Sequence, residues 1–295
     1  MCVQKVNEMY EIVKHYRHDA ALRASFNQLA EKTFGLNLEN WYQNGYWTEN
    51  YDPYSVVTDG KVVANVSVNK TDMVIGGERK HLIQLGTVMT EEAFRNRGLI
   101  RRIMAEIDQD YPDADGIYLF GGDNVLEFYP KFGFHKESEY LYTQEVSQIG
   151  ACEVENVPMN IPENRERLQA AIAKSCVLSA CQMVDNPGLI FFYASQFMQD
   201  CVYYCSRLDA WFIAEQEGGE LLLHNIFCPD PVTPEQAAAA FGSGVQKLFL
   251  GFAPKNVDGY TKEILQEEDC TFFVKGKAFA DFAQQGLRIP SLAHA

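Results

Sequence analysis

The sequence predicts an α/β (α+β) fold in which helices flank a mixed, mostly antiparallel sheet, arranged as two tandem domains. The chain has 295 residues and is 47% hydrophobic, which is long for one ordinary domain and sufficient to bury two cores. Helical periodicity, β-rich hairpins and strand–turn–helix stretches alternate along the first half. A polar segment at 148–165 then precedes a second half in which similar elements recur.

The first half begins with helical periodicity over residues 3–33, and Gly35 is a plausible stop. An aromatic segment at 36–52 follows, which either lines a substrate site or forms a lid of core aromatics. Asp59-Gly60 lies between two β-rich runs and is a strong hairpin signal. Strands are expected at 54–57, 62–68, 81–89, 117–120 and 139–146, with a helix between the third and fourth.

In the second half, the sequence predicts helical stretches from 165 to about 198. Thr233-Pro234-Glu235-Gln236 reads as a helix start, because a threonine cap precedes proline and a glutamine follows three residues later. Strands are expected at 201–206, 211–215, 220–227, 245–252 and 270–274. This order predicts domains at 1–147 and 166–295, joined by a linker at 148–165.

Charge and cysteine usage restrict the class of function. A net charge of −15 argues against a general surface for nucleic acid or anionic membrane, and is compatible with attracting cationic amines. There is no apolar run of membrane-spanning length and no N-terminal signal segment. Eight cysteines without a C-x-x-C pair favour reduced thiols and a cytoplasmic location, and six histidines show no metal spacing, so no metal site is predicted.

One strand–turn–helix stretch stands out against the acidic background. After the strand, Gly98 and four arginines at 95, 97, 101 and 102 surround the start of a helix. Leu99, Ile103 and Ile107 recur every four residues and form its apolar stripe. Free amides, the helix dipole and basic side chains at such a start favour a phosphate or pyrophosphate. The alternative is a solvated basic helix start.

A second motif follows about thirty residues later. Ile117-Tyr118-Leu119-Phe120 reads as a buried strand, and Gly121-Gly122 ends it. Asp123 or Asn124 can then cap a short helix, which leads to Phe128-Tyr129-Pro130-Lys131-Phe132-Gly133-Phe134.

Together these motifs resemble the GNAT acetyltransferase superfamily over residues 1 to about 147. Arg95-Asn96-Arg97-Gly98-Leu99-Ile100 is similar to that family's [QR]-x-x-G-x-[GA] loop, although Ile100 replaces its last small residue. Residues 128–134 resemble its F-Y-x-K-x-G-F signature. The helix asparagine that often meets pantetheine in the family falls at Gly122 here, so Asn124 either substitutes for it or serves only as a cap.

The resemblance implies acetyl transfer from acetyl-CoA to a primary amine, carried by a small molecule or a peptide. Tyr129 aligns with the family tyrosine that protonates the departing thiolate; the alternative is a core aromatic with a satisfied hydroxyl. Cofactor contacts are implied at Val88, Met89, Thr90, Arg95, Asn96, Arg97, Gly98, Leu99, Ile100, Arg101 and Asn124.

Other parts of the mechanism remain open at the level of sequence. Amides freed where two strands splay apart could bind the oxyanion, and Gly86 marks a candidate bulge there. No general base is visible: His81 is a weak candidate, and Glu91 and Glu92 read as turn residues. The alternatives are a catalytically silent acyl-CoA-binding or regulatory module, or an interaction protein.

The second half is predicted to be a degenerate GNAT-like domain. The turn before its helix, at 228–233, has no glycine or arginine and carries an acid. Such a turn should not hold a pyrophosphate.

Overall fold

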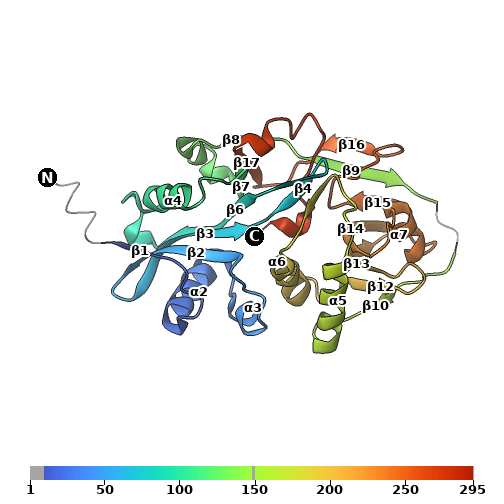
Figure 1. Cartoon of the computed structure of the whole chain (residues 1–295), viewed down its shortest axis with the longest axis horizontal. Coiled ribbons are helices and arrows are strands. Elements are labelled where there is room, and N and C mark those ends of the chain that lie inside the picture. The colour runs from blue at the N-terminus through green and yellow to red at the C-terminus, as the bar shows by residue number, and fades with distance from the viewer. Residues whose placement is uncertain (1–9, 148–149, 295) are drawn as a thin grey trace.

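The computed structural model describes residues 10–147 and 150–294 (Figure 1). Its strands form two seven-stranded sheets and one three-stranded sheet, mostly antiparallel, with helices packed on them. This confirms the predicted fold class. Every helix in the described ranges is too short or too polar to span a bilayer.

The first sheet has the strand order β1-β2-β3-β6-β7-β17-β8. Helices α2 (Ala20–Phe34) and α3 (Glu39–Gln43) pack on one face, and α4 (Leu99–Asp110) packs on the other (Figure 1). The strands are β1 (Glu11–Val13), β2 (Tyr51–Thr58), β3 (Lys61–Lys70), β6 (Leu82–Thr90), β7 (Gly116–Gly121), β17 (Thr271–Lys275) and β8 (His135–Lys136).

The second sheet has the order β10-β12-β13-β14-β15-β9-β16 and repeats the pairing directions of the first, including one parallel pair. Helix α7 (Pro234–Phe241) connects that parallel pair, as α4 connects β6 to β7. The strands are β10 (Glu155–Asn156), β12 (Val202–Cys205), β13 (Ala210–Glu217), β14 (Glu220–Phe227), β15 (Lys247–Leu250), β9 (Tyr140–Glu145) and β16 (Thr261–Ile264).

The two large sheets exchange a strand. β9 follows the first sheet in the chain but pairs with β15 and β16 of the second. β17, near the C-terminal end, pairs with β7 and β8 of the first sheet. The predicted boundaries at 147 and 166 therefore do not separate the sheets, because each half of the chain supplies a strand to the other.

The largest buried cluster is shared by both sheets. It includes Tyr118 and Phe272 from the first sheet and Tyr142 and Phe212 from the second. The small sheet, in the order β11-β4-β5, also joins the halves, because β11 (Cys181–Met183) pairs with β4 (Met73–Ile75), which pairs with β5 (Glu78–Lys80). The halves are thus bound through one hydrophobic core.

Local turn and cap signals were reliable. Asp59 and Gly60 both have positive φ and close the hairpin of β2 and β3. Thr233 and Gln236 form the predicted capping box of α7. Helix α4 ends at Asp110, before Tyr111-Pro112.

Two helical predictions were wrong in part. The range 3–33 includes residues 3–9, which lie outside the described residues, and residues 11–13 form the edge strand β1 paired with β2. The helix begins only after Asp19, whose carboxylate caps it. In the second half, strand β11 separates α5 (Pro162–Lys174) from α6 (Pro187–Phe192), because an external partner strand outweighs the local periodicity.

Candidate functional site

The site begins where the parallel strands β6 and β7 diverge. They pair at Leu82 with Gly116, at Ile83 with Ile117 and at Gln84 with Tyr118. Pairing stops there, although β6 continues to Thr90 and β7 to Gly121. The predicted splay is therefore present, and it leaves the second half of β6 unpaired on the β7 side.

A bulge lies in the diverging part of β6, directly after Gly86. Asn65 pairs with Met89 and Ser67 with Gly86, so Thr87 and Val88 together face the single residue between Asn65 and Ser67. Thr87 has φ +43, which is unusual for a β-branched residue. In the sequence, Gly86 was the one sign of a bulge at this position.

Buried and partly buried hydrogen bonds hold this bulge. Asn65 Nδ2 donates to the Thr87 carbonyl at 2.9 Å, and Thr87 Oγ1 donates to Ser67 Oγ at 2.5 Å. The hydroxyl of Tyr51 lies 2.9 Å from Thr87 Oγ1. Ser55 Oγ in turn donates to Asn65 Oδ1 at 2.8 Å. Sequence analysis missed this network, because its members come from three strands.

Asn65→Ala is expected to lower the free energy of unfolding by about 2 kcal/mol, because the Ser55 hydroxyl and the Thr87 carbonyl lose a buried partner. Denaturant unfolding measures this change. Asn50→Ala is the control, since it removes only an exposed hydrogen bond to the Asp185 carbonyl. Equal midpoints for Asn65→Ala and Asn50→Ala would contradict the proposed role of the network.

The turn before α4 presents backbone amides. Asn96 and Gly98 have φ +61 and +72, and Gly98 is the N-cap without a side-chain cap hydrogen bond. A Cβ at Gly98 would have no atom within 4 Å, so the turn is open to the outside. The predicted loop residues Arg95, Asn96, Arg97, Gly98 and Arg101 are exposed, as an anion site requires.

The arginines of this turn are already oriented. Arg97 Nη1 donates to the Tyr10 hydroxyl at 2.7 Å, and Arg95 Nε donates to the Thr90 carbonyl at 3.4 Å. The Arg101 guanidinium lies 5.3 Å from the ring centroid of Phe132, in the second motif. The structure thus brings the two sequence motifs together at the start of α4.

Leu99 and Ile100 contribute to packing. Leu99 is buried, and Ile100 is half-buried against the core under α4. Because Ile100 packs against the core, its side chain is not free to cover the open turn. Of the remaining predicted contacts, Met89 is buried on the α2 side, whereas Val88 and Thr90 are half-buried in the part of β6 that has no partner on its β7 side.

Tyr129 lies beside the end of β7. Its ring packs on Phe134 and Phe273, and burial raises its pKa to about 12. A Cβ at Gly121 would lie 2.9 Å from its Cε2 atom, so that glycine lets the ring approach β7 closely. Among the described residues its hydroxyl makes no hydrogen bond, which differs from the core aromatic with a satisfied hydroxyl.

Asn124 does not act as a helix cap. It is exposed in a short 3-10 turn whose N-cap is Gly122, without a side-chain hydrogen bond. A Cβ at Gly122 would lie 2.7 Å from Oδ1 of Asp269, which also accepts the Asp123 amide. Asp269, from the far end of the chain, therefore occupies the space that an asparagine side chain at 122 would need.

The weak candidates for a general base lie elsewhere. His81 precedes β6 at the end opposite the splay, and its Nδ1 lies 3.1 Å from Asp72. Glu91 is paired with Lys32 at 2.6 Å, and Glu92 is exposed.

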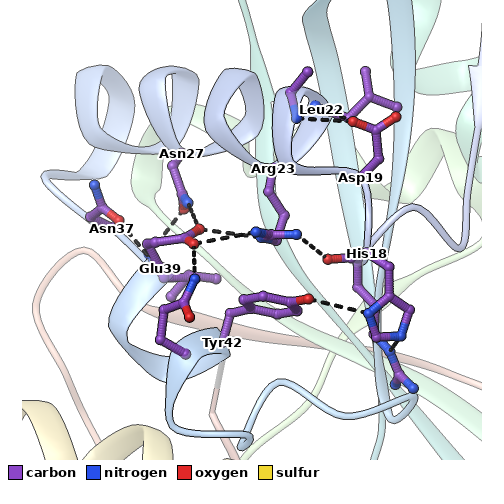
Figure 2. Close-up of polar contacts among 12 residues, drawn as sticks. His18, Asp19, Leu22, Arg23, Asn27, Asn37, Glu39 and Tyr42 are labelled. Atoms are coloured by element: carbon purple, nitrogen blue, oxygen red, sulfur yellow. Dashed lines mark hydrogen bonds and ion pairs between the residues drawn. The ribbon is translucent and has the colours of Figure 1, made fainter.

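Most of the aromatic segment at 36–52 is core. Trp41, Trp47 and Tyr51 are buried against α2, which favours the lid over an open substrate cage. Figure 2 shows how α3 is fixed to α2: Arg23 lies over the ring of Tyr42 at 3.6 Å and donates to Glu39 at 3.2 Å.

The corresponding place in the second sheet has different chemistry. β14 and β15 pair only as far as Leu223 and Leu250, and a cleft of about 270 Å³ lies beyond, at the start of α7. Here the Thr233–Gln236 capping box satisfies a helix amide, and Glu235 accepts a hydrogen bond from Tyr260 at 2.5 Å. An acidic, capped helix start disfavours a pyrophosphate.

Comparison with known proteins gives a family match for part of the chain and fold matches for nearly all of it. Residues 18–136 match the family model described as "Acetyltransferase (GNAT) domain". A conserved protein of unknown function from Enterococcus faecalis V583, named as a probable N-acyltransferase, has TM-score 0.59 and 14% identity, covering 92% of this chain and 74% of that one. A comparison with curated protein sequences gave no match.

Two further solved structures share the fold. A GCN5-related N-acetyltransferase from Kribbella flavida has TM-score 0.54 and 14% identity, covering 94% of this chain and 74% of that one. Eis1 from Mycobacterium abscessus has TM-score 0.53 and 13% identity, covering 89% and 72%. At such identities the likeness concerns the fold, and it extends through both sheets.

Proposed function

We propose that the chain transfers an acetyl group from acetyl-CoA to a primary amine, from the premise that residues 18–136 match the GNAT acetyltransferase domain model. One observation carries the proposal: the open, uncapped start of α4 lies next to diverging strands, and the free hydroxyl of Tyr129 lies beside the same strand end. The proposal thus assigns pyrophosphate binding, the thioester and the general acid to one region.

In the proposed reaction the amine nitrogen attacks the thioester carbonyl carbon. A C–N bond forms, the C–S bond breaks, and the nitrogen loses a proton to solvent or to a base. Backbone amides of the Thr87–Val88 bulge are suited to stabilise the oxyanion, since the hydrogen-bond network fixes the bulge in advance. Tyr129 supplies the proton that the thiolate of CoA takes up.

The test is release of free thiol from acetyl-CoA in the presence of a panel of primary amines. Amine-dependent release supports the proposal. CoA binding without release for any amine would instead indicate a silent acyl-CoA-binding module, and absence of CoA binding would remove both functions.

Calorimetric titration is expected to give one CoA per chain. The start of α4 is open and basic, whereas the start of α7 is capped by Thr233 and carries Glu235. A stoichiometry of two would show that the second half also binds CoA and would contradict its degenerate assignment.

A further inference from the structure

A cavity of about 350 Å³ lies at the carboxyl end of β7, between the first sheet and the segment that follows β16. Phe120 of β7 and Phe272 of the exchanged strand β17 form an aromatic wall, with ring centroids 5.2 Å apart. Glu137, Glu139 and Glu267 also line the cavity.

This cavity is next to the region assigned to acetyl transfer. Phe120 lies two residues beyond Tyr118, the last β7 residue paired with β6. The next residue, Gly121, is in close contact with the Tyr129 ring. Because the parallel strands β6 and β7 end at the same edge, the cavity and the splay share that edge.

Glu139 gives the cavity a polar group that lacks a full set of partners. The residue is only 5% exposed, and Oε1 accepts the Ile289 amide at 2.7 Å. Within the described residues, Oε2 makes no hydrogen bond, and it is not among the fully enclosed atoms. Because Glu139 lines the cavity, this oxygen is available to a donor placed there.

The charges around the cavity favour a cationic donor once Glu139 is ionised. Lys136 is the cationic residue of its lining, against the three glutamates. Nη2 of Arg288 lies 3.8 Å from Oε1 of Glu267, and Nη1 of Arg288 donates to the Leu250 carbonyl at 2.9 Å. Arg288 thus offsets Glu267 in part, while Oε2 of Glu139 stays open.

We propose that this cavity binds the acceptor of the reaction proposed above, and that the acceptor is a primary amine on an apolar arm. The inference rests on the proposed function. Carboxylate oxygens receive the N–H donors, and the Phe120–Phe272 wall receives the apolar arm. The exchanged strand β17 is then part of the substrate site.

The first experiment measures binding of 2-phenylethylamine to the full chain, with 2-phenylethanol as the neutral isostere. The amine is expected to bind at least about tenfold more tightly, because only it carries a charge-assisted donor. Equal affinities, or no binding of the amine, would overturn the proposal.

Variants then locate the binding. Glu267→Gln is expected to weaken amine binding by about fivefold, because it removes one partly exposed charge. Glu139→Gln is expected to weaken it by about tenfold at pH 9, where Glu139 is ionised. Glu263→Gln, at an exposed position of β16 outside the cavity lining, should leave the affinity unchanged. Wild-type affinity in both cavity variants would overturn the proposal.

The dependence of amine affinity on pH gives an independent measurement. Burial raises the pKa of Glu139 to about 8, offset by the Ile289 amide and Arg288 and reinforced by Glu267. Burial also raises the pKa of Cys270 to about 12, so that thiol stays neutral; Lys136 and Glu137 complete the charged lining. As pH rises from 6 to 9, through this pKa, Glu139 loses its proton, so affinity should increase. An equal slope in Glu139→Gln would count against Glu139.

The readouts separate the two proposals. CoA affinity and thiol release report on acetyl transfer, whereas amine affinity without CoA reports on the cavity. If the chain binds the amine but releases no thiol from acetyl-CoA, only the proposed acetyl transfer is contradicted. Amine-dependent thiol release whose KM is unaffected by Glu267→Gln and Glu139→Gln contradicts only the cavity.

Discussion

Tyr129→Phe is expected to lower kcat by about 10- to 10⁴-fold while CoA affinity and folding are retained. A thiol has a pKa of ~8.5, so a thiolate leaves tolerably near neutral pH and a general acid helps without being indispensable. The substitution keeps the ring against Phe134 and Phe273. It removes a hydroxyl that makes no hydrogen bond to the described residues, so stability should change little.

The measurements are kcat with a working amine and the melting temperature with and without CoA. Tyr111→Phe is the control for turnover, because it removes the hydroxyl of a half-buried tyrosine at the opposite end of α4 from the turn. Full turnover in Tyr129→Phe would end the general-acid assignment and leave protonation of the thiolate to water.

Gly98→Glu is expected to weaken CoA binding by about 100-fold, because like charges about 5 Å apart near a protein surface repel by roughly 3 kcal/mol. The carboxylate would stand at the open start of α4, where free amides and the helix dipole favour an anion. Because a Cβ at Gly98 meets no atom within 4 Å, the side chain can be accommodated without a clash.

Gly98→Gln is the matched control for charge. Both variants place a Cβ on a residue with φ +72, which costs each about 1–2 kcal/mol of stability. Calorimetry on the folded variants compares their CoA affinities, and the difference between glutamate and glutamine should shrink with added salt. Equal affinities for Gly98→Glu and the wild type would exclude this turn as the pyrophosphate site.

The sequence predicted features whose determinants lie close together in the chain. Gly98 and the arginines predict the turn before α4, and Asp59-Gly60 predicts the first hairpin. The expected bulge lies one residue after Gly86, because a bulge needs the partner strand to define its position. In these cases short-range chemistry, such as positive φ or a helix start, is sufficient.

Features that depend on distant residues could not be predicted. Gly122 departs from the family pattern, which has an asparagine at this position. The structure gives the reason, because Asp269 fills the space that a side chain at 122 would need. The hydrogen bond from the Asp123 amide to Asp269 spans 146 residues of sequence. Likewise, the apolar run at 270–274 identifies a strand, but nothing in its alternation indicates which sheet it joins.

The strand exchange also affects how the protein can fold during synthesis. Gly121 pairs with Thr271, so 150 residues separate the partners (271 − 121). At a translation rate of roughly 5–20 residues per second, β17 is synthesised about 10–30 s after β7, and until then this edge of β7 has no partner strand. An unpaired strand edge is a template for pairing with other chains. The nascent N-terminal half therefore passes through an aggregation-prone interval, which ends only when β17 leaves the ribosome and closes the first sheet.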